Sequence, residues 1–171
     1  MNHRKLRGLA VGATLAFGAT AAFAQVTSPQ TATLNVSATV ASVCQLSAPS
    51  DISFGSVQAG VTANAAGSVT IACNKGATVS ASVTSANALL TQKRMQLGPD
   101  YLDYQVWQPD LAAPATCAAS QTDWTGSLGM SSLWAANGGP RIIAICATTT
   151  PSNALPAGLY TDVLTVSVSF S

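Results

Sequence analysis

The stretch Leu164-Thr165-Val166-Ser167-Val168-Ser169-Phe170 decides the fold of this chain. Apolar side chains alternate with small polar ones along it, which is the period-two pattern of a strand with one buried face. Similar alternation, or a short apolar run, recurs in six earlier segments: residues 32–40, 52–57, 68–73, 77–83, 101–107 and 141–146. Because many short strands follow one another without a heptad, a repeat or an amphipathic helix, the predicted fold class is an all-β sandwich.

Some of these strands can be placed relative to one another. The turn Asn74-Lys75-Gly76 lies between residues 68–73 and 77–83, and predicts that these two strands form a hairpin. The nearly continuous apolar run in residues 141–146 is suited to a central strand. Residues 110–140 are rich in Gly, Ala and Ser, and predict long loops with one or two short strands.

The first 24 residues have the composition of a secretory signal peptide. Three basic residues, Arg4, Lys5 and Arg7, precede an apolar stretch over residues 8–21, and Ala22-Phe23-Ala24 is a small-residue cleavage site. The alternative is a membrane anchor, but the apolar run is interrupted by glycines and is shorter than the ~18 residues of a spanning helix. We therefore expect export, with Gln25 as the new N-terminus.

Removal of 24 residues from 171 leaves a chain of 147 residues with four basic side chains and six aspartates, a net charge of −2. The only histidine, His3, is lost with the signal. So few basic groups argue against nucleic-acid binding, which needs a basic face. Catalysis by a Ser–His–Asp or Cys–His arrangement is excluded because no histidine base remains.

Four cysteines, Cys44, Cys73, Cys117 and Cys146, remain in the exported part. An even number in an exported protein predicts two disulfides, and four cysteines allow three pairings. Their order along the chain favours Cys44–Cys73 and Cys117–Cys146. The chain has no C-x-x-C pair and no remaining histidine, so we expect neither a zinc site nor another metal site.

Other candidates for catalysis are weak. Asp100, Asp103 and Asp110 could supply paired carboxylates, but we expect them to be solvated residues of loops near Gly98-Pro99. Lys75 and Lys93 could serve a serine nucleophile, but one lies in a turn, the other adjoins Arg94, and neither looks buried. No phosphate-binding glycine motif is present, so we expect no enzyme and no cofactor.

Three tryptophans, Trp107, Trp124 and Trp134, could form a sugar-stacking surface, but in a small β domain they are more often part of the core. The two ends of the exported chain raise a separate question. The polar residues 25–30 lead into the alternating segment 32–40, and residues 164–170 alternate in the same way. An open sheet edge invites a strand from another chain. The alternative, that both segments pair within one closed sandwich, remains open.

Five segments, residues 40–46, 52–57, 69–77, 102–107 and 157–166, occur in an order that resembles the spore coat U domain family, which includes the Csu-type pilins of archaic chaperone–usher pili. The Gly158-Leu159-Tyr160-Thr161-Asp162 motif and the cysteines at 44 and 73 contribute most to the resemblance. It covers nearly all of the exported chain.

The resemblance implies an incomplete immunoglobulin-like sandwich, formed by residues 39–171, that is completed by a donor strand. Residues 25–38 would be the donor segment, and Cys44–Cys73 would be the family's disulfide, whereas Cys117 and Cys146 are not expected from the family pattern. The implied donor residues are Ala32, Leu34, Val36 and Ala38, and those of the acceptor groove and chaperone contact are Leu164, Val166, Val168 and Phe170.

The resemblance also implies partners and a location. A periplasmic chaperone would fill the groove first, an outer-membrane usher would follow, and neighbouring subunits would replace the chaperone. The expected function is that of a structural subunit of a pilus, exported to the periplasm and displayed at the surface for adhesion and biofilm formation. The alternative is a self-contained secreted domain that binds glycans or a surface.

Overall fold

The fold was obtained as a computed structural model that describes residues 29, 31–117 and 122–171. The expected signal peptide, residues 1–24, lies outside the described residues. The chain divides into two units, residues 1–38 and residues 39–171, and the second contains all the regular structure described here. Within the described part, no helix is long and apolar enough to cross a membrane.

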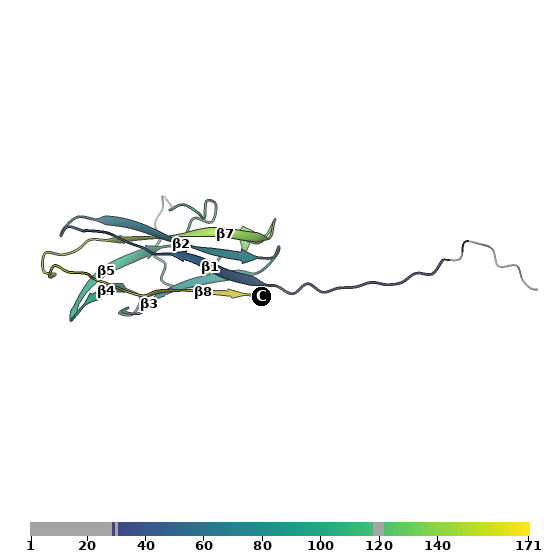
Figure 1. The fold of residues 1–171 in the computed structure, drawn as a ribbon, viewed down its shortest axis with the longest axis horizontal. Helices are drawn as coiled ribbons and strands as arrows, with labels where there is room; N and C mark the ends of the chain where they lie inside the picture. The colour runs from purple at the N-terminus through teal and green to yellow at the C-terminus, as the bar shows by residue number, and fades with distance from the viewer. Residues whose placement is uncertain (1–28, 30, 118–121) are drawn as a thin grey trace, which may run out of the picture. The chain divides into compact units, whose positions relative to one another are not determined.

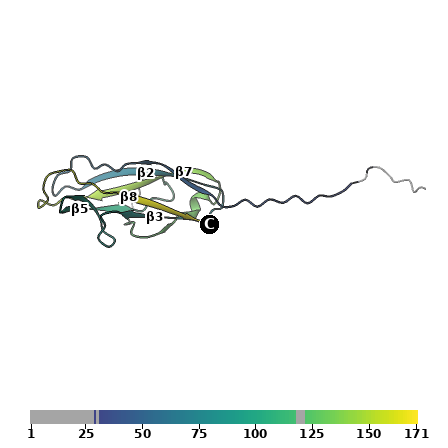
Figure 2. The same cartoon turned by 60° about the horizontal axis from the view of Figure 1, so that its bottom comes forward.

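Residues 39–171 form a sandwich of two antiparallel sheets, shown in Figures 1 and 2. The larger sheet has the order β1 (Cys44–Ser50), β2 (Ala63–Cys73), β7 (Gly139–Thr149), β5 (Asp100–Trp107) and β4 (Lys93–Leu97). The smaller has the order β6 (Leu128–Gly129), β3 (Val79–Ser85) and β8 (Leu164–Phe170), and one 3₁₀ turn, η1, covers Ser131–Trp134. This immunoglobulin-like arrangement confirms the all-β prediction.

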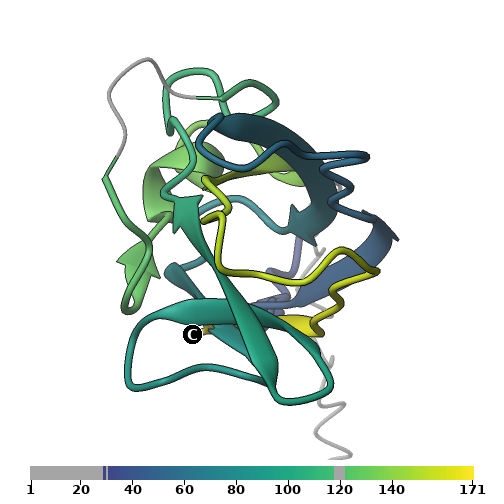
Figure 3. The same ribbon diagram turned by 90° about the vertical axis from the view of Figure 1, so that its left-hand side faces the viewer.

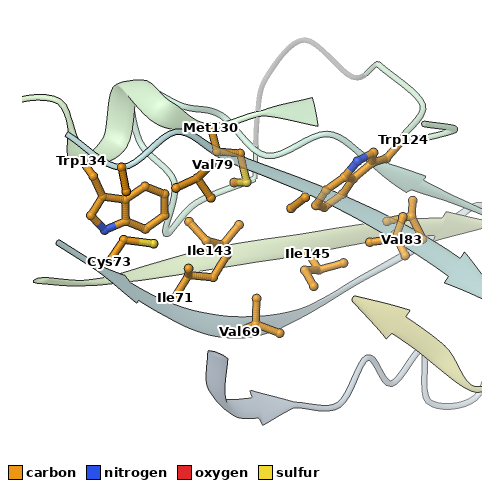
Figure 4. Close-up of a cluster of buried hydrophobic side chains, with 14 of the residues drawn as sticks. Val69, Ile71, Cys73, Val79, Val83, Trp124, Met130, Trp134, Ile143 and Ile145 are labelled. Atoms are coloured by element: carbon orange, nitrogen blue, oxygen red, sulfur yellow. The ribbon is translucent and has the colours of Figure 1, made fainter. Parts of the chain in front are cut away.

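The core lies between the two sheets, and the period-two alternation explains which side chains reach it. In β2 alternate residues such as Ile71 are buried, and in β7 the consecutive residues 143–147 are all buried. Val79 of β3 faces Ile71 and Ile143 (Figure 4). Trp134 and Trp124 also belong to this cluster. Each fully buried side chain of this size contributes about 1.5–3 kcal/mol, so these alternating strands supply much of the stability.

The hairpin prediction for residues 68–83 is wrong. The strands exist, but β2 and β3 belong to different sheets. β2 already has β1 on one edge and β7 on the other, so no edge remains for β3. The turn at Asn74-Lys75-Gly76 instead carries the chain from one sheet to the other. Gly76 permits this with a φ of +79°, and its N–H donates to the Trp134 carbonyl at 2.9 Å.

Two other predicted strands are absent. Residues 32–40 have no regular secondary structure and are exposed, and residues 52–57 pair with no strand in the part of the chain that the structure describes. Ile52 and Phe54 still pack against the core. Gly55 explains the loss of pairing in this segment, because its φ of +64° breaks an extended backbone.

Strand β4 was not predicted because its sequence, Lys-Arg-Met-Gln-Leu, is mostly polar. The expectation that Lys93 is exposed is also wrong, since only 3% of this residue is accessible. Its ammonium donates to the Trp124 carbonyl at 2.8 Å and lies 3.7 Å from Asp123 Oδ1. Lys93 can be buried because its charge has these partners.

Candidate binding groove

A groove with a volume of about 700 Å³ opens on one side of the sandwich, between the two sheets. One flank is the segment 49–57, and the other is β8 with the preceding residues 158–162. Its floor is formed by side chains of the larger sheet: Val69, Met95, Leu102, Tyr104 and Ile145. The groove is therefore an opening into the core, bordered by β8 at the edge of the smaller sheet.

Strand β8 pairs with β3 over seven residues without a register shift. Just beyond this ladder, Thr78 and Ser171 exchange two backbone hydrogen bonds, at 3.1 and 3.0 Å. Hydrogen-bonded and non-hydrogen-bonded pairs alternate in an antiparallel ladder, so the even-numbered residues of β8 occupy the non-hydrogen-bonded positions. The backbone N–H and C=O groups of Leu164, Val166 and Val168 therefore point to the open edge of the sheet.

The four predicted groove residues do not share one environment. Leu164 and Val166 line the groove. Val168 packs against the core outside the groove lining, and Phe170 is 46% exposed at the far end of β8. The structure thus places the first two in the groove, while the contact of all four with a chaperone stays a prediction.

The opposite flank is less regular. Pairing of β1 with β2 shifts register between Ser47 and Ser50, and Pro49 has no N–H to donate. The chain then passes close over Gly67 of β2, where an added Cβ would lie 2.8 Å from Cγ1 of Ile52. Because β8 is unbroken and β1 is not, β8 is the better edge for an added strand.

The residues just before β8 are tied to the larger sheet by the Gly-x-Tyr-x-Asp motif. Thr161 and Gln96 exchange backbone hydrogen bonds of 2.8 and 3.1 Å. The Asp162 carboxylate accepts from the Tyr104 hydroxyl at 2.5 Å and from Asn87 Nδ2 at 3.0 Å. Burial, together with this hydrogen bond, raises the pKa of the Tyr104 phenol well above its ordinary value. The sequence analysis did not predict the hydrogen bond between Tyr104 and Asp162, although it identified the motif that contains Asp162.

Both disulfides follow the order of the cysteines in the chain. Cys44 and Cys73 join β1 to β2 with their Cα atoms 4.2 Å apart, and Cys117 and Cys146 join the loop after β5 to β7 with Cα atoms 5.7 Å apart. The first bridge fixes the start of β1, which is the strand that leads into the irregular flank of the groove.

The other predicted candidates lie in different environments. Trp124 and Trp134 are fully buried in the core, so they cannot stack on a sugar, whereas Trp107 at the end of β5 is half-buried. Asp100 and Asp103 lie in strand β5 and not in loops as expected, and Asp103 is exposed. Among the described residues, no three His, Cys, Asp or Glu side chains gather as metal ligands would. The groove is therefore the feature whose function needs an explanation.

The predicted donor residues, Ala32, Leu34, Val36 and Ala38, are all exposed and lie in no strand. Leu34 and Val36 are 84% and 93% accessible. The structure places them in the unit that precedes residue 39, and their pairing with a groove stays a prediction.

Comparison with known proteins bears on the family. No curated protein sequence matches significantly. A chain in the crystal structure of the CsuC–CsuE chaperone–tip adhesion subunit pre-assembly complex, from archaic chaperone–usher Csu pili of Acinetobacter baumannii, matches with 22% identity and a TM-score of 0.49. The match covers 77% of this chain but only 40% of that one. The family model of the Spore Coat Protein U domain matches residues 30–167, so the chain belongs to the spore coat protein U domain family.

Proposed function

We propose that this chain is a structural subunit of a surface pilus that assembles by strand addition. The observation that carries the proposal is the outer edge of β8, which pairs with no strand among the described residues, borders an apolar groove and directs backbone hydrogen-bonding groups outward. An added strand gains main-chain hydrogen bonds along such an edge and places alternate side chains in the groove. Residues 32–38 of a neighbouring copy have the required alternation.

The energetics favour this pairing. Leu34 and Val36 are almost fully exposed, and burial of each contributes about 1.5–3 kcal/mol. The groove also gains, because its apolar floor is removed from water. Ala32 and Ala38 add less area, so the two larger side chains dominate the expected affinity.

An open groove needs protection before assembly. Exposed apolar surface and an unpaired strand edge promote aggregation, so we propose that a periplasmic chaperone occupies the groove and that an outer-membrane usher releases it. Export by residues 1–24 delivers the chain to the periplasm, and assembly displays it at the surface as a fimbrium. Adhesion and biofilm formation are the roles that such a fibre would serve.

The proposal can be tested on the chain beginning at Gln25, with a synthetic peptide of residues 29–42 as the probe. We expect multimers whose size grows with concentration in light scattering. Excess peptide would cap the groove, reduce the multimers to monomers and raise the melting temperature. A scrambled peptide of the same composition is the control. The proposal would be overturned if the chain stayed monomeric, resisted proteolysis and bound neither peptide.

A further inference from the structure

A second hollow, with a volume of about 350 Å³, lies on the outer face of the larger sheet. Its lining comes from β2, β7, the end of β5 and the loop that follows β5, and it shares no residue with the lining of the groove. The side chain of Trp107 faces outward here, because it follows the core residue Val106 in an alternating strand. We call this feature the outer hollow.

Two rows of neighbouring side chains on the outer face form the floor and rim of the outer hollow. Each row crosses β5, β7 and β2 in that order, and the rows are Trp107, Cys146 and Ala66, then Gln105, Thr148 and Asn64. Residues opposite one another in a sheet have Cβ atoms about 5 Å apart, and residues two apart on one strand are about 7 Å apart. An indole ring therefore lies beside two amides and one hydroxyl.

The loop that follows β5 forms a wall of the outer hollow and is fixed in place. The Cys117–Cys146 disulfide ties the loop to the floor, and the Ala144 N–H donates to the Pro114 carbonyl at 2.6 Å. Figures 1 and 3 show this loop (green) at the top of the view and β8 (yellow) near the bottom, so a strand added beside β8 leaves the hollow accessible. The disulfide that is not expected from the family pattern thus has a role in building this site.

The polar groups of the outer hollow are available to a ligand. Asn64 and Gln105 are exposed, and Thr148 and Trp107 are half-buried. The Trp107 Nε1–H is buried and has no hydrogen-bond partner in the part of the chain that the structure describes. A buried donor without a partner is costly, so this group calls for an acceptor that the described residues do not supply.

The lining selects a neutral ligand that has one apolar face and hydroxyl groups around it. No charged side chain is found among the described lining residues, so a phosphorylated or acidic ligand would gain no ion pair. A hydrocarbon would remove the amides and the hydroxyl from water without replacing their hydrogen bonds. A sugar ring satisfies both groups, since its C–H face packs on an indole and its hydroxyls bond to amides. Ligand pockets have volumes of roughly 300–1,000 Å³, so the hollow has room for about one or two sugar rings.

We propose that the outer hollow binds a hexose ring of a neutral oligosaccharide. Trp107 stacks on the ring, and three polar side chains bond to its hydroxyls: Asn64, Gln105 and Thr148. This inference goes beyond the proposed function and does not depend on it, because the two sites share no residue. In a fibre every subunit would present one such site, so weak sites would bind a polysaccharide together.

Tryptophan fluorescence of the chain beginning at Gln25 can report binding, because Trp124 and Trp134 are buried in the core and Trp107 is the tryptophan of the hollow. The probes are cellotetraose, chitotetraose and maltotetraose, and glycerol at the same concentration of hydroxyl groups is the control. We expect at least one of the three oligosaccharides, and not glycerol, to change the emission in a saturable manner. Calorimetry then gives the affinity of the variants, and Trp107→Ala should lower it about tenfold or more.

A pair of matched variants tests the polar part of the site. Thr148→Val removes a hydroxyl at nearly constant shape and should weaken binding about fivefold. Thr70→Val makes the same change on the outer face of β2, about 20 Å from Asn64, and should have no effect. Thr148→Val also keeps the test valid if Trp107→Ala does not fold.

The inference would be overturned if none of the three oligosaccharides bound saturably, or if Trp107→Ala and Thr148→Val bound as tightly as the unmodified chain. Equal weakening by Thr148→Val and Thr70→Val would place the sugar outside the hollow and would overturn it as well. Multimer formation, measured by light scattering, should be the same in Thr148→Val and in the unmodified chain. The loss of sugar binding and the loss of strand addition can therefore be told apart.

Discussion

Replacement of Val36 by aspartate tests the donor segment most directly. Val36 lies in the middle of the alternating residues 32–38 and is 93% exposed in the single chain. The substitution therefore leaves the sandwich itself unchanged, and its effect should be confined to assembly. We expect the variant to fold and to bind an added strand in its own groove. Its residues 32–38 should no longer bind in the groove of another copy.

The magnitude follows from what an occupied groove would bury. Loss of the valine removes about 1.5–3 kcal/mol of burial, and an unpaired carboxylate in an apolar groove costs several kcal/mol more. A total of at least about 4 kcal/mol corresponds to a loss of about 1,000-fold in affinity between copies. Assembly should then be undetectable at micromolar concentration, which light scattering on the chain beginning at Gln25 can measure.

Ser37→Asp is the matched control, since it adds the same charge one residue later. Side chains alternate between the two faces of a strand, so an aspartate at 37 would point to solvent and should assemble normally. If Ser37→Asp blocks assembly and Val36→Asp does not, the donor register is shifted by one residue. If both variants assemble like the unmodified chain, the donor segment lies elsewhere and the reasoning is refuted.

Three further variants test the sandwich. Lys93→Met should lower the free energy of unfolding by about 1–3 kcal/mol in urea, because the Trp124 carbonyl loses its charged donor; an unchanged midpoint would contradict this. Burial raises the pKa of Tyr104 in the folded chain above its ordinary value of 10.0, so the native chain is stabilised below pH 10 and loses this stabilisation as the pH rises further. Tyr104→Phe should remove this pH dependence of the free energy of unfolding. A variant with the same alkaline slope as the native chain would refute the assignment. Joint replacement of Cys117 and Cys146 by serine should cost about 3–4 kcal/mol in the chain-entropy model, and an unchanged melting temperature would count against it.

The sequence predicted those strands whose alternation matches burial within the single chain. In β5 the apolar residues Leu102, Tyr104 and Val106 face the core as expected, and the apolar run of residues 141–146 does form the central strand β7. Strand β5 is predictable because the opposite sheet covers one of its faces, and β7 is predictable because its residues 143–147 are buried in an unbroken run.

The predictions that failed depend on contacts between residues far apart in the sequence, which a local pattern of residues does not contain. β4 was missed because its buried lysine is satisfied by a carbonyl 31 residues away along the chain. The turn after β2 looked like a hairpin turn, and only the pairing of β2 on both edges shows that it is not. Within the groove, the bond between Tyr104 and Asp162 joins residues 58 positions apart. Long-range partners of this kind leave little trace in the spacing of residues.

The prediction of a strand at residues 32–40 failed for a different reason. Its pattern is that of a half-buried strand, yet its apolar side chains are exposed in the single chain. The edge of β8 has the converse problem, since its backbone groups and the groove beside it lack a partner in the described chain. The proposed donor residues 32–38 and the strand β8 are both seven residues long. When two copies meet, residues 32–38 of one copy can pair with the edge of β8 in the other. The segment then gains a sheet, and the edge gains a strand. The apparent error of the sequence pattern is therefore what we expect of a chain whose last strand comes from its neighbour.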